Sequence, residues 1–370
     1  MQNFISEKSI LQSIKGDLGG DDYKEPLTVL IESLNDEANL NSIGRIALKY
    51  QISSHLKIRS KIFSFLEDNE FTKPSNPIFV IGLPRSGTTF LFNLLSLDPN
   101  YRSPLMWEMF FPFPLLHKKS ISYKLRLKKA DLLISFQKKL IPDLDVIHPI
   151  NSTDPEECLL ITPYSLKSLL YSYMANIPSY EDYLQQADKS SVYLWHSRFL
   201  GVLESMEKPT NWLLKDPNHI AHLSEIKSIY PQARFINIHR DPVESIPSIC
   251  SLTEKTRRPF SQDVDKIVIG ERTLAYWERA LKKGKEAIDD IDKKDYLNLR
   301  FRDLVANPLK QMELIYSHFG LNFSDRLQID MTRYIDKYQS IKLTKHNYKL
   351  EEFGLNEDSV QNTVGKYLDF

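Results

Sequence analysis

Short apolar runs, each followed by a stretch with helical spacing, divide much of the chain into strands and helices. Residues 78–81 form a fully apolar run between Pro77 and Gly82, which predicts a buried parallel strand. The apolar residues within 90–97 recur at helical spacing, so a helix should follow this strand directly. A strand, a glycine loop and a helix in this order are typical of the opening of a nucleotide-binding α/β unit.

The same alternation returns in the second half of the chain. Strands are expected at 212–215, 234–238 and 296–299, and helices at 219–230, 243–253, 271–290 and 303–319. Alternating strands and helices predict an α/β fold, in which helices flank both faces of a parallel central sheet.

The remaining segments are expected to be helical additions to this core. Helices should occupy much of residues 1–70, and the aromatic and proline-rich middle should hold helices near 122–140, 155–175 and 190–206. We expect a single domain spanning 1–370. Its parts are a helical N-terminal extension (1–73), the loop unit (74–100), a helical insertion (101–210), the rest of the core (211–330) and a C-terminal tail (331–370).

Composition narrows the class of protein. Lys and Arg number 48, and so do Asp and Glu, so the chain has no net charge and a nucleic-acid module is disfavoured. Two cysteines exclude a disulfide scaffold and suit a reducing compartment. The first residues lack a signal-peptide pattern, and no run approaches the roughly 18 apolar residues of a membrane-spanning helix. A soluble, cytoplasmic protein without a transmembrane segment is expected.

The loop at residues 82–89, G-L-P-R-S-G-T-T, has the glycine spacing of the phosphate-binding P-loop, G-x-x-x-x-G-K-[ST]. Its backbone N–H groups and the following helix N-terminus would surround a phosphate. Thr88 stands where the P-loop has lysine, and Arg85 puts a cation inside the loop instead. Because an NTPase needs that lysine and Mg²⁺, this loop suits a single 5′-phosphate that bears a leaving group. A turn without a ligand is the alternative, which the flanking strand and helix disfavour.

A second anion site is predicted after the strand at 234–238. Arg240 ends this strand and would give a forked, charge-assisted contact to a phosphate dianion. Ser248 follows eight residues later, about two turns into the next helix, and Ser245 is the second choice. Alone, Arg240 would be interpreted as a surface ion pair. Together with the glycine loop, it indicates a 3′,5′-bisphosphate nucleotide rather than ATP.

Residues 81–90, I-G-L-P-R-S-G-T-T-F, resemble the 5′-phosphosulfate loop of sulfotransferases that use 3′-phosphoadenosine 5′-phosphosulfate (PAPS). The resemblance implies that Arg85 stabilises the departing oxygen, that Phe90 lies near the adenine, and that Arg240 and Ser248 hold the 3′-phosphate. The nucleotide-binding residues that it implies are Arg85, Ser86, Gly87, Thr88, Thr89, Phe90, Arg240 and Ser248, with Lys345, His346 and Tyr348 closing over the nucleotide.

Further segments resemble the bacterial-type branch of this family, and the likeness extends over about residues 75 to 370. They are W-L-L-K-D-P-N-H (212–219), Y-P-Q-A-R-F (230–235), F-R-D-L with N-P (301–308) and H-N-Y-K-L-E-E-F-G (346–354). The Lys-Thr-His triplet and the R-K-G…G-D-W-K motif of the animal cytosolic branch are absent. The resemblance therefore implies the P-loop NTPase-like sulfotransferase fold.

The implied reaction transfers a sulfuryl group from PAPS to a hydroxyl group and leaves 3′-phosphoadenosine 5′-phosphate (PAP). Like phosphoryl transfer, it is an in-line displacement that needs a clamped donor, a stabilised leaving group and a base. The sulfuryl group carries one negative charge, so no metal is expected. Lys215 ends a core strand, where open α/β sheets place ligands, and would stabilise the transferred group. The alternative is a surface lysine paired with Asp216.

Three residues are candidates for the base, because a group near the sulfuryl must accept the proton of the hydroxyl. His219 follows Lys215, and His196 lies in the aromatic insertion. Glu157, with Glu156, belongs to an Asp-Pro-Glu-Glu element that resembles one in the family. A neutral histidine suits proton abstraction near pH 7, which ranks His219 first, His196 second and Glu157 third. The alternatives are structural histidines and acids that begin a helix.

The aromatic insertion suggests an apolar pocket for a small hydroxyl acceptor, such as a lipid, sterol or polyketide, although aromatic side chains are more often ordinary core and also stack on sugars. Two other functions stay open. A nucleotide or small-molecule kinase with an aberrant P-loop would bind Mg²⁺–ATP. A non-catalytic protein would bind PAP and turn over no acceptor.

Overall fold

The computed structural model describes residues 5–71, 74, 76–116, 120–141, 144, 149–207, 211–340 and 348–368. The chain forms two compact units. Unit 1 comprises Met1–Pro74, Pro104–Lys208 and Leu252–Asp265, and unit 2 comprises Ser75–Ser103, Pro209–Ser251 and Lys266–Phe370. The chain alternates between the units, so neither is one continuous segment. The assignment of 1–370 to a single domain stays a prediction.

Unit 2 contains a five-stranded parallel sheet. Its strands are β1 (Ile78–Gly82), β2 (Tyr101–Arg102), β3 (Asn211–Lys215), β4 (Arg234–His239) and β5 (Tyr296–Arg300), in the order β2-β3-β1-β4-β5. The four strands expected from apolar runs are confirmed. The sequence missed β2, because two residues are too few to show a pattern.

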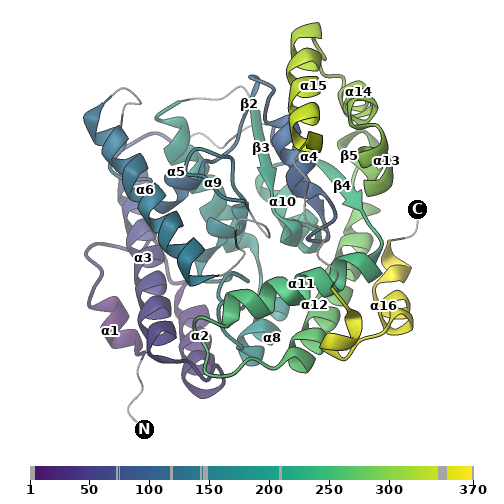
Figure 1. Cartoon of the computed structure of the whole chain (residues 1–370). Coiled ribbons are helices and arrows are strands. Elements are labelled where there is room, and N and C mark those ends of the chain that lie inside the picture. The colour runs from purple at the N-terminus through teal and green to yellow at the C-terminus, as the bar shows by residue number, and fades with distance from the viewer. Residues whose placement is uncertain are drawn as a thin grey trace. The chain divides into compact units, whose positions relative to one another are not determined.

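Helices cover both faces of the sheet, as the alternation predicted (Figure 1). Those of unit 2 are α4 (Thr88–Leu95), α10 (Leu223–Ile229), α12 (Lys266–Ile288), α13 (Phe301–Ala306), α14 (Pro308–His318), α15 (Asp325–Ser340) and α16 (Glu357–Thr363), with 3₁₀ turns η3 (Pro217–His222), η4 (Lys293–Asp295), η5 (Leu350–Phe353) and η6 (Gly365–Tyr367). Helix α11 (Pro242–Arg257) starts in unit 2 and ends in unit 1. Among the described residues, no helix is both long and apolar enough to cross a bilayer.

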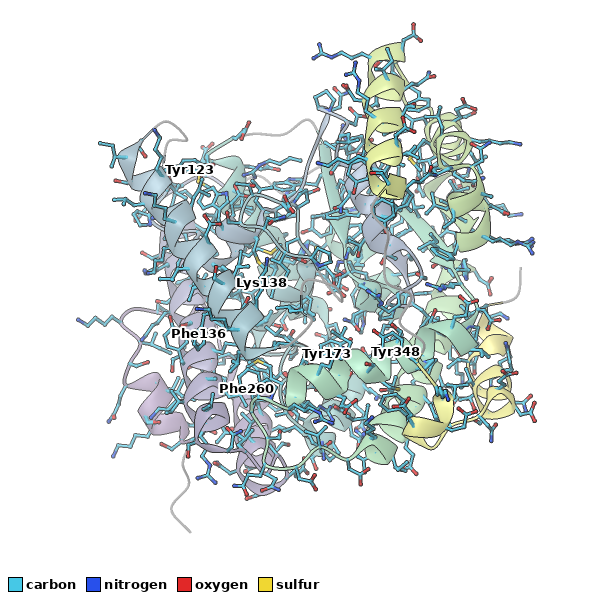
Figure 2. The ribbon with its side chains drawn as sticks, viewed as in Figure 1. Tyr123, Phe136, Lys138, Tyr173, Phe260 and Tyr348 are labelled. Carbon is cyan, nitrogen blue, oxygen red and sulfur yellow. The ribbon has the colours of Figure 1, made fainter. Side chains whose placement is uncertain are left out.

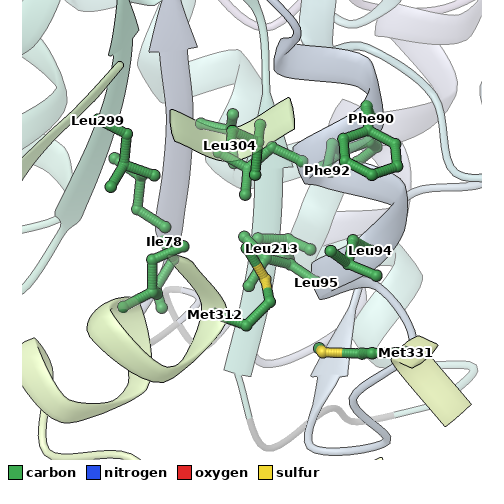
Figure 3. Close-up of a cluster of buried hydrophobic side chains, with 14 of the residues drawn as sticks. Ile78, Phe90, Phe92, Leu94, Leu95, Leu213, Leu299, Leu304, Met312 and Met331 are labelled. Carbon is green, nitrogen blue, oxygen red and sulfur yellow. The ribbon is translucent and has the colours of Figure 1, made fainter. Parts of the chain in front are cut away.

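The side chains of β1 alternate between two buried layers because successive residues of a strand point to opposite faces. Ile78 and Val80 join the cluster formed with α4, α14 and α15 (Figure 3). Phe79 faces the other layer, where it contacts His219, Tyr230 and Phe235. Because both faces are buried, the strand is apolar throughout and lacks the alternation of a half-exposed strand.

Two predicted elements of unit 2 differ in detail, and one helix was not predicted. The helix expected over 303–319 is two helices, because Pro308 cannot continue α13 and Asn307 instead caps α14 by accepting from the backbone N–H of Lys310. The helix expected from His219 begins as the 3₁₀ turn η3, which Asp216 caps. Helix α15, which was not predicted, extends to Ser340 and so into the segment assigned as the C-terminal tail.

Unit 1 is helical, as expected for the N-terminal extension and the insertion. Its helices are α1 (Glu7–Leu11), α2 (Lys24–Asp36), α3 (Ser42–Glu67), α5 (Met106–Phe110), α6 (Ile121–Leu140), α8 (Pro178–Gln186) and α9 (Ser190–Glu204). The helix predicted near 155–175 is wrong. Only the 3₁₀ turns η1 (Cys158–Leu160) and η2 (Thr162–Ser165) form there, and the left-handed backbone of Leu166 (φ 58°) stops propagation.

Several aromatic residues of the insertion form the core of unit 1. Tyr171 and Tyr180 pack with α2 and α3. Their hydroxyl groups are used locally, since Tyr171 Oη lies 2.8 Å from His55 Nδ1 and Tyr180 Oη donates to the carbonyl of Leu166. These side chains are therefore structural, and an acceptor pocket cannot be argued from their aromatic character alone.

Candidate active site

The glycine loop joins β1 to α4 at the carboxyl edge of the sheet. β1 connects onward toward β2 and β4 connects toward β5, on opposite sides, so the adjacent ends of β1 and β4 form the topological switch point of unit 2. Open α/β sheets bind ligands at such a point. Gly82 and Ile238 are paired across this edge, which brings the loop beside the start of the Arg240 segment.

Both glycines of the loop are required by close packing. Gly82 has φ 134°, and a Cβ there would lie 2.3 Å from the carbonyl oxygen of Ile238. Gly87 has φ 95°, and a Cβ there would lie 2.6 Å from the ring of Phe301. Arg85 also adopts a left-handed backbone (φ 68°), which costs a non-glycine residue about 1–3 kcal/mol. The structure therefore keeps a strained loop conformation at the residue whose cation is predicted to bind the nucleotide.

The loop presents backbone groups and hydroxyl groups at the start of α4. The Ser86 hydroxyl donates to the carbonyl of Leu83 at 2.6 Å, so this side chain tightens the turn. α4 begins at Thr88, and its first N–H groups lack partners within the helix. These N–H groups and the positive end of the helix dipole favour an anion at this point.

The second predicted anion site lies against the loop. Arg85 Nε donates to Ser248 Oγ at 3.1 Å, and Arg240 Nη1 donates to the carbonyl of Arg85 at 2.9 Å. The structure therefore brings together Arg85, Arg240 and Ser248, which the sequence assigned to two separate phosphate contacts. Ser245, the second choice, is completely buried, and its hydroxyl has no hydrogen-bond partner among the described residues.

Arg240 also makes the surface ion pair that was the alternative interpretation. Its guanidinium lies 2.6 Å from Glu244, whose side chain is 58% exposed, and stacks over the ring of Phe301 at 4.3 Å. A pair this exposed is worth about 0–1 kcal/mol. Breaking the Arg240–Glu244 ion pair would therefore cost little free energy when Arg240 binds a phosphate instead.

Lys215 is buried on the α4 side of the sheet. It pairs in register with Val80, which points toward α4, and its Nζ donates to Thr89 Oγ1 at 3.2 Å. Only 1% of Lys215 is exposed, so it is not the surface lysine of the alternative interpretation. The Asp216 carboxylate accepts from the backbone N–H and the side-chain amide of Asn218. The ammonium of Lys215 is thus held beside the loop.

His219 lies one turn beyond Lys215, on η3. Its ring packs edge-on against Phe79, with centroids 5.0 Å apart, on the sheet face opposite to α4. The side chain is almost completely buried. His219 belongs to the same unit as the loop, although it contacts a different face of β1 from Lys215.

The other two base candidates belong to unit 1. His196 is fully buried on α9, and burial lowers the pKa of its imidazole to about 3. Glu157 is half-buried and directly precedes η1, while the carboxylate of Glu156 accepts from the Glu157 backbone N–H. The Asp-Pro-Glu-Glu element thus begins a single 3₁₀ turn rather than a helix.

Acid should destabilise the fold through its buried histidines. Burial lowers the pKa of His55 and His196 to about 3 and that of His239 to about 4, all below the usual 6.5. Between the lowered pKa values and pH 6.5, these histidines are protonated in the unfolded chain and neutral in the folded chain. The free energy of unfolding therefore falls as the pH drops below 6.5. We expect a loss of up to about 2 kcal/mol per histidine near pH 5. Urea unfolding near neutral pH and near pH 5 measures it. The His55→Phe variant should lose less than wild type, and an equal loss in both would contradict this account.

An aromatic cluster beside the loop was missed at the sequence level. The ring of Phe90 lies 4.5 Å from Tyr338, which in turn stacks with Tyr334 one turn earlier on α15. Burial raises the pKa of Tyr338, and the nearby Arg85 cation partly offsets the rise. The four-residue spacing of the tyrosines was a visible signal of a helix face. Among the residues expected to close over the nucleotide, Tyr348 is half-buried, and Lys345 and His346 lie outside the described residues.

A family model described as "Sulfotransferase family" matches residues 77–325, which include the loop, Lys215 and the Arg240 segment. The match covers more than half of the chain. The chain belongs to the sulfotransferase family. It is therefore a sulfotransferase, as the loop resemblance implied.

Relatives of this sulfotransferase occur in mycobacteria. Omega-hydroxy-beta-dihydromenaquinone-9 sulfotransferase Stf3 of Mycobacterium bovis and of Mycobacterium tuberculosis is 24% identical over 304 residues, covering 79% of this chain and 74% of Stf3. The crystal structure of sulfotransferase STF1 from Mycobacterium tuberculosis H37Rv is 29% identical, with a TM-score of 0.84 over 99% of this chain and 100% of STF1. STF9 from Mycobacterium avium, 22% identical, has the same fold, with a TM-score of 0.87 over 100% of this chain and 97% of STF9.

Proposed function

We propose that this sulfotransferase uses PAPS as its donor and transfers the sulfuryl group to a hydroxyl of a small hydrophobic acceptor, giving a sulfate ester and PAP. The observation that carries the donor assignment is the contact of Arg85 with Ser248 and, through its carbonyl, with Arg240. A loop for one phosphate beside an arginine–serine pair for another suits a 3′,5′-bisphosphate nucleotide. The absent P-loop lysine argues against a nucleoside triphosphate.

In this proposal some residues bind the donor nucleotide and others contact the transferred sulfuryl group. The N–H groups at the start of α4 and the Arg85 guanidinium would hold the 5′ side and stabilise the oxygen that departs when its bond to sulfur breaks. Arg240 would exchange its weak pair with Glu244 for the 3′-phosphate, with Ser248 as hydroxyl donor. Lys215 would face the sulfuryl oxygens beside Thr89.

A hydrophobic acceptor is supported by one relative. Stf3 is named for its acceptor, an omega-hydroxylated menaquinone, which is a lipid alcohol. We propose an acceptor of the same chemical class, an apolar molecule that carries one hydroxyl group. Radiolabelled PAPS, incubated with hydroxylated lipids and in parallel with sugars, tests this function. Label should move to a lipid. Transfer to sugars alone would overturn the acceptor class, and PAP binding without transfer to any acceptor would indicate a non-catalytic protein.

His219 is the proposed base, since it shares unit 2 with the loop and Lys215. The His219→Asn variant should lower kcat by about 10²–10⁴ because proton abstraction from the hydroxyl would be lost. PAP affinity should stay at the wild-type value, and the loss should vanish for an acceptor that already ionises at the assay pH. Steady-state kinetics and PAP titration measure these effects.

His222→Asn is the matched control, because this histidine lies on the same turn and pairs with Glu225 at 3.7 Å on a partly exposed surface. It should keep the wild-type kcat. If His219→Asn also kept it, the base would have to be sought at His196 or Glu157.

A further inference from the structure

Helix α6 carries a row of exposed apolar side chains. Ile121, Leu125, Leu132 and Phe136 are 78%, 60%, 70% and 59% exposed. They follow one another at intervals of four, seven and four residues, which places all four on one face of the helix. Large apolar side chains exposed singly are ordinary, but four on one face of a helix are typical of an interaction surface.

The opposite face of α6 already anchors the helix. Ala130 and Ile134 are buried there, and Ile134 packs with Met106 of α5. Tyr123 lies edge-on to Trp107, with ring centroids 5.2 Å apart (Figure 2 labels Tyr123, Phe136 and Lys138 on this helix). The fold of unit 1 therefore holds α6 without using the exposed row.

The exposed face is also basic. α6 contains six Lys or Arg residues and one Asp, a net charge of +5 in a chain whose total is zero. Lys128 follows Ile121 by seven residues and Lys139 follows Leu132 by seven, so both lie in line with the apolar row, and both are exposed. Lys124 is exposed at its border, and Lys129 lies 4.5 Å over the ring of Phe111.

We propose that the outer face of α6 binds the surface of an anionic phospholipid bilayer. Apolar side chains would enter the boundary between headgroups and acyl chains, while the lysines extend to the phosphates. A second copy of this chain fits the face poorly, because it would set lysines against lysines, and because lysine is depleted from the cores of protein interfaces. Seven charged residues among its twenty make α6 an interfacial helix rather than a spanning one.

Only the biological reason for membrane binding rests on the proposed function. A lipid alcohol resides in a bilayer, so a sulfotransferase held at the bilayer surface would meet its acceptor at high local concentration. Vesicle binding is measured without PAPS or acceptor. Its failure would leave PAP binding and sulfuryl transfer untouched, and failure of those reactions would leave vesicle binding untouched.

Co-sedimentation of the full chain with vesicles tests the proposal. The protein should pellet with vesicles of equal parts phosphatidylcholine and phosphatidylglycerol, and it should stay in solution with phosphatidylcholine alone. The Leu125→Gln, Leu132→Gln, Phe136→Gln triple variant should stay in solution with both. Each lysine near an anionic surface contributes about fivefold to partitioning, so the Lys124→Gln, Lys128→Gln, Lys139→Gln variant should bind roughly 100-fold more weakly.

The matched control is the double variant Leu314→Gln, Ile329→Gln, which removes exposed apolar side chains of unit 2. It should pellet like wild type. All variants should keep the wild-type melting temperature and PAP affinity, because every substituted side chain is exposed, and the single Phe136→Gln variant replaces the triple variant if the latter unfolds.

Three results would overturn the proposal. One is that the wild-type protein stays in solution in the presence of anionic vesicles. Another is undiminished binding by both triple variants. The third is a wild-type dimer that the apolar triple variant converts to a monomer, without any vesicle binding, since a second copy of the chain would then cover α6.

Discussion

Replacing Arg85 with alanine should weaken PAP binding about 100-fold, because a charge-assisted hydrogen bond contributes about 1.5–3 kcal/mol and each 1.4 kcal/mol is a factor of ten. The Arg85 guanidinium donates to Ser248, and the backbone carbonyl of Arg85 accepts from Arg240. Alanine keeps the backbone carbonyl that Arg240 contacts, so the expected loss comes from the guanidinium, which would hold the 5′ side of the nucleotide and contacts Ser248 beside it. Calorimetric titration with PAP measures the change.

The control for Arg85→Ala is Arg326→Ala, which removes the same charge from a 94% exposed side chain of unit 2. Wild-type affinity is expected for it. Alanine has a Cβ, as arginine does, so the left-handed backbone at residue 85 stays equally unfavourable in the variant. The melting temperature should therefore change little. Equal PAP affinities for wild type and Arg85→Ala would refute the assignment of the loop.

Replacing Lys215 with methionine should lower kcat by about 10²–10³ while changing PAP affinity far less, because in the proposed function its cation stabilises charge that develops on the transferred group. Methionine keeps most of the buried volume of this side chain, which is 1% exposed. Sulfuryl transfer under saturating donor, compared with PAP titration of the same variant, separates the two effects.

Thr89→Val provides a second variant that leaves Lys215 in the chain. It removes only the hydroxyl that accepts from Nζ at 3.2 Å, so the ammonium loses one contact that positions it, and kcat should fall by less than in Lys215→Met. A Lys215→Met enzyme with normal kcat and a lowered melting temperature would assign this lysine a structural role.

Much of the core was predictable from local sequence because a strand buried on both faces must be apolar throughout. The runs at Ile78, Trp212 and Phe235 therefore identified β1, β3 and β4. The glycine loop was equally visible, since the approach of Ile238 and Phe301 permits no Cβ at Gly82 or Gly87. Both requirements, apolar residues in a buried strand and glycine in a tightly packed loop, concern only a few consecutive residues. They are therefore visible in the local sequence.

Features that depend on distant residues were not predictable. The contact between Arg85 and Ser248 joins residues 163 positions apart, and no local pattern signals it. The packing of Tyr338 on Phe90 is equally remote, and a polar sequence around the tyrosine concealed α15. The burial of His219 against Phe79 follows from the path of η3 rather than from its own residue type.

The central claim is that unit 2 binds a 3′,5′-bisphosphate nucleotide, and a thermal-shift titration tests it most directly. PAP without metal is compared with ATP plus Mg²⁺. A ligand at about 100 times its dissociation constant adds about 2.7 kcal/mol of stability, which gives a clear rise in melting temperature. The account predicts that PAP raises the melting temperature in the presence of a metal chelator. No response to PAP, together with a Mg²⁺-dependent response to ATP, would contradict it.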